Sequence, residues 1–171
     1  MCAVTASCSQ PHPHNDHTAP DDFALSVTVL GAPAATPDSS PAPVWLILSQ
    51  DNSLWAQWGN RTRRSTIPPA VRVLSRPDVE RVYQLTRATG VLGTPAGGHR
   101  IAAASDALPE VVTPAPTHRA VVVEYSAGGA RRAFLFLPDE AASAPWDAAC
   151  ALAYSLGTLA RQEPPTSAGG R

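Results

Sequence analysis

RAVVVEYSAGGARRAFLFL, residues 119–137, is the stretch that decides the fold. Two runs rich in β-branched and aromatic residues, 119–125 and 131–137, flank the tetrapeptide Ala127-Gly128-Gly129-Ala130. Adjacent glycines accept the positive φ angles of a two-residue primed turn, so the pattern predicts a β-hairpin. The turn length also fixes which side chains share a face. The face predicted to lie under the helices carries Val121, Val123, Tyr125, Phe134 and Phe136, and the other carries Val122, Glu124, Ala133 and Leu135.

Three more strands are predicted upstream of this hairpin. Residues 23–29 alternate between apolar and small or polar side chains, which is the period of a half-buried strand. Two further runs, Val44–Ser49 and Leu54–Trp58, flank a polar turn at residues 50–53. If this hairpin also closes on a two-residue turn, Trp45 opposes Trp58 and Ile47 opposes Ala56 on one face. The other face then carries Leu46, Leu48, Trp55 and Gln57.

Two segments show helical periodicity. Ser75 is placed to cap the first helix and Gly90 to end it. Ser143 and Pro145 signal the start of the second helix, and Pro164 signals its end. The resulting order, βββαββα, predicts an α+β fold with a mostly antiparallel five-stranded sheet and two helices packed on one face.

The rest of the chain sets the predicted domain boundaries. Residues 1–21 are polar and rich in Pro and His, so they are interpreted as a disordered leader. A single domain follows over residues 22–163, and residues 164–171 form a disordered tail. Residues 93–118 make a long loop, and loops of this length are functional, disordered or contain a short element such as a helical turn at Ile101–Leu108.

Composition excludes several classes of partner. The 171 residues carry a net charge of −1, and all 13 basic residues are Arg. No strong field therefore favours nucleic acid or an anionic membrane, and a nucleic-acid partner is not expected. No apolar run approaches the roughly 20 residues that a membrane-spanning helix needs.

The start of the chain contains a candidate lipid-anchor site. Val4-Thr5-Ala6-Ser7-Cys8 is similar to the end of a bacterial lipoprotein signal, in which small residues precede an acceptor cysteine. The charged start and apolar stretch of such a signal are absent. The prediction is therefore a cell-envelope or secreted protein that contacts a membrane only through Cys8. A cytoplasmic protein is the alternative.

The leader also holds a histidine cluster. His12, His14 and His17 are spaced closely enough to bind copper, nickel or zinc weakly. A specific metal site needs rigid elements and supporting hydrogen bonds, which this segment does not offer. No cofactor is predicted.

Catalytic constellations are incomplete. Nucleophilic catalysis needs a base held in place by a third group, and the only histidines in the body of the chain are His99 and His118, which flank the long loop. An enzyme of unrecognised type that uses one of them is kept as an alternative. Cys150 falls inside the second predicted helix and is interpreted as a small buried apolar side chain.

The second face of the predicted sheet is more apolar than a solvated face should be. Two explanations stay open: the 93–118 loop covers this face, or the face is exposed for a protein partner. In the second case Leu46, Leu48 and Trp55 are the candidate contacts. The leading interpretation is a non-enzymatic extracytoplasmic binding domain that contacts another protein through this face or through the 93–118 loop.

A family resemblance points the same way. The segments 23–29, 45–58 and 121–137 and the helix start LSRPDVERV (74–82) resemble, in their order, small bacterial envelope proteins and the emfourin-type inhibitors of thermolysin-like metalloproteases. The resemblance spans residues 22–162 and implies a non-enzymatic role, with protease inhibition through the 93–118 loop as an alternative function. The family's Gly-Gly-Phe-like phrase is replaced here by Leu30–Ala34, and the long loop has no counterpart. No inhibitory residue is therefore carried over.

Overall fold

The computed structural model describes residues 18–31, 41–59, 68–92, 99–101, 119–138 and 144–162. Within them, the strands are β1 Ala24–Leu30, β2 Val44–Leu48, β3 Ser53–Trp58, β4 Ala70–Val73, β5 His99–Ile101, β6 Ala120–Ala127 and β7 Ala130–Phe136. The helices are α1 Arg76–Ala88 and α2 Ala144–Arg161.

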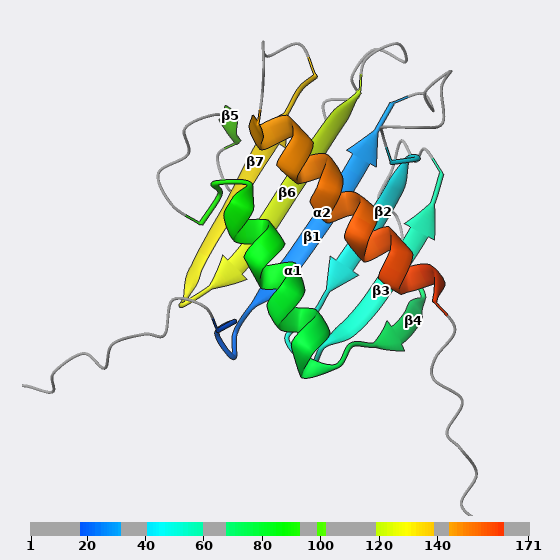
Figure 1. The fold of residues 1–171 in the computed structure, drawn as a ribbon, viewed down its shortest axis with the longest axis vertical. Helices are drawn as coiled ribbons and strands as arrows, with labels where there is room; N and C mark the ends of the chain where they lie inside the picture. The colour runs from blue at the N-terminus through cyan, green and yellow to red at the C-terminus, as the bar shows by residue number, and fades with distance from the viewer. Residues whose placement is uncertain are drawn as a thin grey trace, which may run out of the picture.

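All of these strands form one sheet in the order β4-β3-β2-β1-β6-β7-β5, and each neighbouring pair is antiparallel. Both helices lie on the same face of this sheet (Figure 1). The predicted α+β class and the placement of both helices on one face are therefore confirmed. The predicted count of five strands is wrong, because β4 and β5 extend the sheet at its two edges.

The second hairpin has the predicted register. Ala127 pairs with Ala130, Val123 with Phe134 and Val121 with Phe136. The turn glycines Gly128 and Gly129 have φ angles of 59° and 73°, as a primed turn requires. Alternation along both strands then places the predicted apolar set on the helix side, where all five side chains are buried.

The first hairpin differs from its predicted register by one residue. Its loop contains three residues, Gln50–Asn52, because Asn52 adopts a left-handed conformation with φ of 64° and its N–H donates to the carbonyl of Ser49 at 2.9 Å. Val44 therefore opposes Trp58, and Ile47 opposes Trp55. A slip of one residue exchanges the two faces of a strand. Leu46 and Leu48, predicted as partner contacts, are 0% and 1% exposed beneath the helices.

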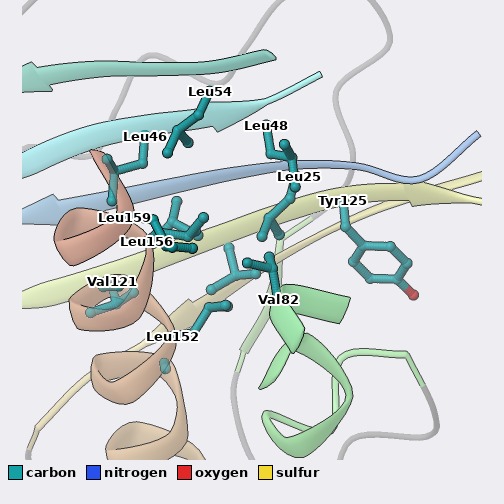
Figure 2. Close-up of a cluster of buried hydrophobic side chains, with 14 of the residues drawn as sticks. Leu25, Leu46, Leu48, Leu54, Val82, Val121, Tyr125, Leu152, Leu156 and Leu159 are labelled. Atoms are coloured by element: carbon teal, nitrogen blue, oxygen red, sulfur yellow. The ribbon is translucent and has the colours of Figure 1, made fainter. Parts of the chain in front are cut away.

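The core fills the space between the helix side of the sheet and the two helices. Figure 2 shows Leu25, Leu46, Leu48, Leu54 and Val121 of the sheet directed toward Val82 of α1 and toward α2. α2 contributes three leucines about one turn apart, Leu152, Leu156 and Leu159, together with the small side chains Ala149, Cys150 and Ala153. Burial of such side chains stabilises the fold by roughly 1.5–3 kcal/mol each.

Local signals hold the helix ends in place. The Ser75 hydroxyl accepts a hydrogen bond from the N–H of Asp78, so Ser75 is the N-cap of α1, as predicted. Gly90 has φ of 80° just beyond the helix end, and the following residue, Val91, is fully buried. The Tyr125 hydroxyl donates to the Val91 carbonyl at 2.9 Å, which ties this helix end to β6.

One predicted boundary and the content of the predicted loop differ from the structure. Composition places residues 18–21 in the leader, but Ala19 is 3% exposed and its carbonyl accepts a hydrogen bond from the Arg76 guanidinium at 2.7 Å. Ala19 is therefore packed into the domain, ahead of the predicted boundary at residue 22. The 93–118 loop contains β5, which pairs with β7 at the sheet edge. A strand of three residues is too short to show periodicity, and Ile101 lies in it rather than in a helical turn.

Candidate binding surface

The face of the sheet opposite α1 and α2 is called here the helix-free face. Strand register places its side chains in two neighbouring cross-strand rows. One row runs Trp55, Ile47, Ser26, Glu124, Ala133, and the other runs Gln57, Trp45, Thr28, Val122, Leu135.

Five large apolar side chains in these two rows are partly exposed. They are Trp45, Ile47, Trp55, Val122 and Leu135, whereas the apolar side chains of β1, β2, β6 and β7 that face the helices are buried. The outer face of an antiparallel sheet covered on one side only is normally polar. The helix-free face is therefore unusually apolar, and apolar surface retained at such a position is typical of an interaction site.

Three of the five side chains lie together on β2 and β3, and Trp45, Ile47 and Trp55 are called the β2–β3 patch. Ile47 is directly opposite Trp55, and Trp45 is two residues away on the same face. The Trp45 indole N–H donates to the Ser26 hydroxyl at 3.2 Å, and that of Trp55 donates to the Ser49 hydroxyl at 3.3 Å. Because both indole N–H groups have partners within the domain, the patch offers a partner mainly apolar ring surface.

A polar turn borders the patch. The Asp51 carboxylate accepts hydrogen bonds from the Ser49 hydroxyl at 2.6 Å and from the N–H and hydroxyl of Ser53 at 3.1 and 3.0 Å. These bonds, that from Ser49 first, lower the pKa of Asp51. The turn that supplies the partner of the Trp55 indole is thus held by an ionised carboxylate, which gives the patch a fixed and charged border.

The structure locates some of the residues predicted as site residues. Trp55 lies on the helix-free face and is partly exposed, so its role as a contact residue stays a prediction. Leu46 and Leu48 are in the core, and their neighbours Trp45 and Ile47 lie on the helix-free face instead. His99 begins β5, where its backbone pairs with Leu135. Cys8, His12, His14, His17 and His118 fall outside the described residues, so the lipid anchor and the weak metal site stay predictions.

Metal-binding residues do not cluster in the described part of the chain. Its His, Cys, Asp and Glu side chains form no group of three that could hold a metal ion. The one cysteine within the described ranges, Cys150, is buried in α2, and burial, followed by the nearby Asp147 charge, raises the pKa of its thiol to about 11. Such a thiol is protonated at neutral pH and is a poor nucleophile. The interpretation of Cys150 as a buried side chain is confirmed.

Sequence reasoning missed Trp45 and Ile47 because it assumed a two-residue turn. The available signal was Asn52, since Asn is one of the few residues other than Gly that readily adopts positive φ. Placing Asn52 in the left-handed position makes a three-residue loop, which brings Trp45, Ile47 and Trp55 onto one face.

Comparison with known proteins finds no match for this chain among protein-family models, curated proteins or solved structures. In the part of the chain that the structure describes, no helix is long and apolar enough to cross a membrane.

Proposed function

We propose that this protein is a non-enzymatic protein-binding domain and that the β2–β3 patch is its contact surface. The observation that carries the proposal is the grouping of Trp45, Ile47 and Trp55, all partly exposed, on a sheet face that neither helix covers.

The composition of the patch suits a protein interface. Tryptophan is enriched among the few residues that dominate binding energy, and a hot-spot truncation costs at least about 2 kcal/mol. The N–H groups of the Trp45 and Trp55 rings are anchored to Ser26 of β1 and to Ser49 just after β2, respectively. An anchored ring loses little conformational entropy on binding, which lowers the cost of association.

The proposed cellular location is the cell envelope, and this part of the proposal rests on the sequence. The lipoprotein-like run ending at Cys8 supports a domain tethered to the cell envelope, with residues 9–17 linking the anchor to the domain. If the partner is a thermolysin-like metalloprotease, the domain would act as an inhibitor similar to those of emfourin type.

The first experiment identifies the partner through the patch. A photoreactive amino acid replaces Ile47 in the protein expressed in its native host, and the same amino acid replaces Tyr154, which is 69% exposed on α2, as a matched control. We expect a cross-linked protein from position 47 that position 154 does not yield.

Affinity for the purified partner then tests the patch itself. Trp55→Ala should weaken binding by about 30-fold, the equivalent of 2 kcal/mol, whereas Tyr154→Ala should change it less than about twofold. Circular dichroism and thermal unfolding of both variants check that the fold is retained. A Trp55→Ala variant that is folded and binds as tightly as the parent protein would exclude the patch as the contact surface.

A further inference from the structure

The strand directions constrain how the chain travels from β5 to β6. Both β5 and β6 pair antiparallel with β7, so β5 and β6 are parallel to each other with β7 between them. Following the antiparallel pairs from β6 through β1, β2 and β3 shows that β4 has this same direction. The chain therefore makes two successive crossovers between parallel strands, first from β4 to β5 and then from β5 to β6.

The first crossover has a known face and hand. It contains α1, which lies on the helix side, and it passes from one edge of the sheet, β4, to the other edge, β5. With β1 pointing up in the view of Figure 1, β4 lies at the right, β5 at the left and α1 in front of the sheet. Strands pointing down and a step to the left in front of the sheet make a right-handed crossover, the hand that almost all such connections have.

The second crossover runs back in the opposite direction. Two crossovers that join strands of the same direction but step in opposite directions can share one hand only if they lie on opposite faces of the sheet. Since the first lies on the helix side, a right-handed second crossover lies on the helix-free face. This placement follows from strand order, strand direction, the position of α1 and the right-handed rule for crossovers.

We propose that the helix-free face over β7 and β6 is an intramolecular docking surface for residues 102–118, the connection from β5 to β6. The connection has to cross two strand spacings, about 10 Å, and return a few residues along the strands. Seventeen residues in extended form reach about 55 Å, so the length is sufficient for a path that lies flat on the sheet.

The chemistry of the two surfaces agrees with this placement. The connection contains an apolar group, Leu108, Val111 and Val112, and its prolines at 109, 114 and 116 disfavour a helix. The surface beneath presents Val122 and Leu135, which are opposite each other on β6 and β7. Apolar side chains on both partners gain free energy by leaving water together.

Docking of the connection divides the helix-free face into two parts. The connection covers the β6 and β7 half, whereas the β2–β3 patch lies on the far side of β1 and stays open to a partner. The covering of β6 and β7 does not rest on the proposed binding function, and its test requires no partner.

Chemical cross-linking tests which face the connection occupies. In the full chain with Cys2→Ser and Cys8→Ser, Val111→Cys is combined with Leu135→Cys on the helix-free face. The matched control combines it with Tyr154→Cys on the helix side, and the buried Cys150 is kept in both. A bismaleimide with a spacer of about 10 Å, two strand spacings, joins the pairs. We expect a link between positions 111 and 135 and none between positions 111 and 154; a link from 111 to 154, or no link in either protein, overturns the proposal.

Thiol reactivity gives a second measurement that needs no link. Maleimide should label a cysteine introduced at position 135 at least about tenfold more slowly than one at position 47. Substituting Leu108, Val111 and Val112 together with serine should remove this protection at 135 and leave the rate at 47 unchanged within about twofold. Equal rates at the two positions in the parent chain contradict the docking, and unfolding caused by the substitutions would show as labelling of Cys150.

Discussion

At the scale of single residues, one carboxylate joins the start of the domain to its most regular hairpin. Asp22 accepts hydrogen bonds from the backbone N–H groups of Gly128 and Gly129 at 2.8 and 2.7 Å, one with each oxygen. These bonds, that from Gly129 first, lower the pKa of Asp22 below its ordinary value of 3.8. They connect parts of the chain more than a hundred residues apart, so they hold the N-terminal segment against the turn that sets the register of β6 and β7.

Replacing this carboxylate should make stability less dependent on acid pH. A carboxyl group with a lowered folded pKa stabilises the fold fully above its unfolded pKa, near 3.8, and the contribution is lost as pH falls through the folded pKa. Asp22→Asn should therefore lower the urea midpoint at pH 7 and lose less of it between pH 5 and pH 2 than the parent protein.

The matched control for this change is Asp21→Asn. Asp21 is exposed, and its ion pair with Arg76 is 4.0 Å long, so its removal should leave the midpoint almost unchanged. Identical acid profiles for the parent protein and Asp22→Asn would show that the two hydrogen bonds do not contribute to stability in solution.

A second single residue, Asn52, determines which face of β2 meets the helices. A left-handed conformation costs a residue with a Cβ atom about 1–2 kcal/mol, less for Asn and nothing for Gly. Asn52→Gly should therefore keep or raise the free energy of unfolding. Asn52→Ala should lower it by about 1 kcal/mol, measured by urea denaturation. If both variants have the same stability, the loop tolerates another conformation and Asn52 does not control the register.

At the scale of elements, the two hairpins show what the sequence can predict. The glycines at 128 and 129 permit one short primed turn, so the register of β6 and β7 could be predicted residue by residue. Residues 50–52 contain no glycine, and their sequence is compatible with either a two-residue or a three-residue loop. The two-residue loop assigns Leu46 and Leu48 to the helix-free face, whereas the three-residue loop of the structure turns them toward the helices. The strand that contains them is predicted correctly. β4 and β5 have four and three residues, too few for a period to be visible, and only pairing with β3 and β7 makes them strands.

At the scale of elements, the contact between α2 and β3 can be tested directly by mutation. Gly157 of α2 faces the Trp58 ring, and a Cβ atom added there would lie 3.3 Å from the Cη2 atom of the ring. The Arg161 guanidinium lies 4.0 Å from the ring centroid and holds the ring against the helix.

Gly157→Ala therefore combines a gain in helix propensity of about 1 kcal/mol with a crowded contact. Trp58 is 41% exposed at the end of its strand, so the ring can shift, and we expect a net change below about 0.5 kcal/mol. In a Trp58→Ala background the same substitution should stabilise by about 1 kcal/mol. Urea denaturation of the four proteins measures this coupling as a double-mutant cycle, and strictly additive effects would show that the ring does not limit the residue at 157.

At the scale of the whole molecule, the domain includes residues that composition assigns to a leader. A chain that begins at Thr18 should unfold with the same urea midpoint as the full chain. A chain that begins at Phe23 loses buried Ala19, its hydrogen bond with Arg76, and Asp22. Its free energy of unfolding should fall by at least about 1 kcal/mol. Asp22→Asn is the control that separates the carboxylate from the rest, and equal midpoints for both shortened chains would move the boundary to Phe23.

The position of β1 at the centre of the sheet has a consequence for the order in which the protein is made. β1 leaves the ribosome first and can pair with β2 at once, but its other neighbour is β6, about 90 residues later. At 5–20 residues per second, translation leaves one side of the central strand without its partner for roughly 5–20 s. During this interval the nascent chain exposes an unpaired apolar edge, the feature from which β-sheet proteins aggregate. Slower elongation between β3 and β6 should therefore lower the soluble yield, whereas a pause after β7 should not.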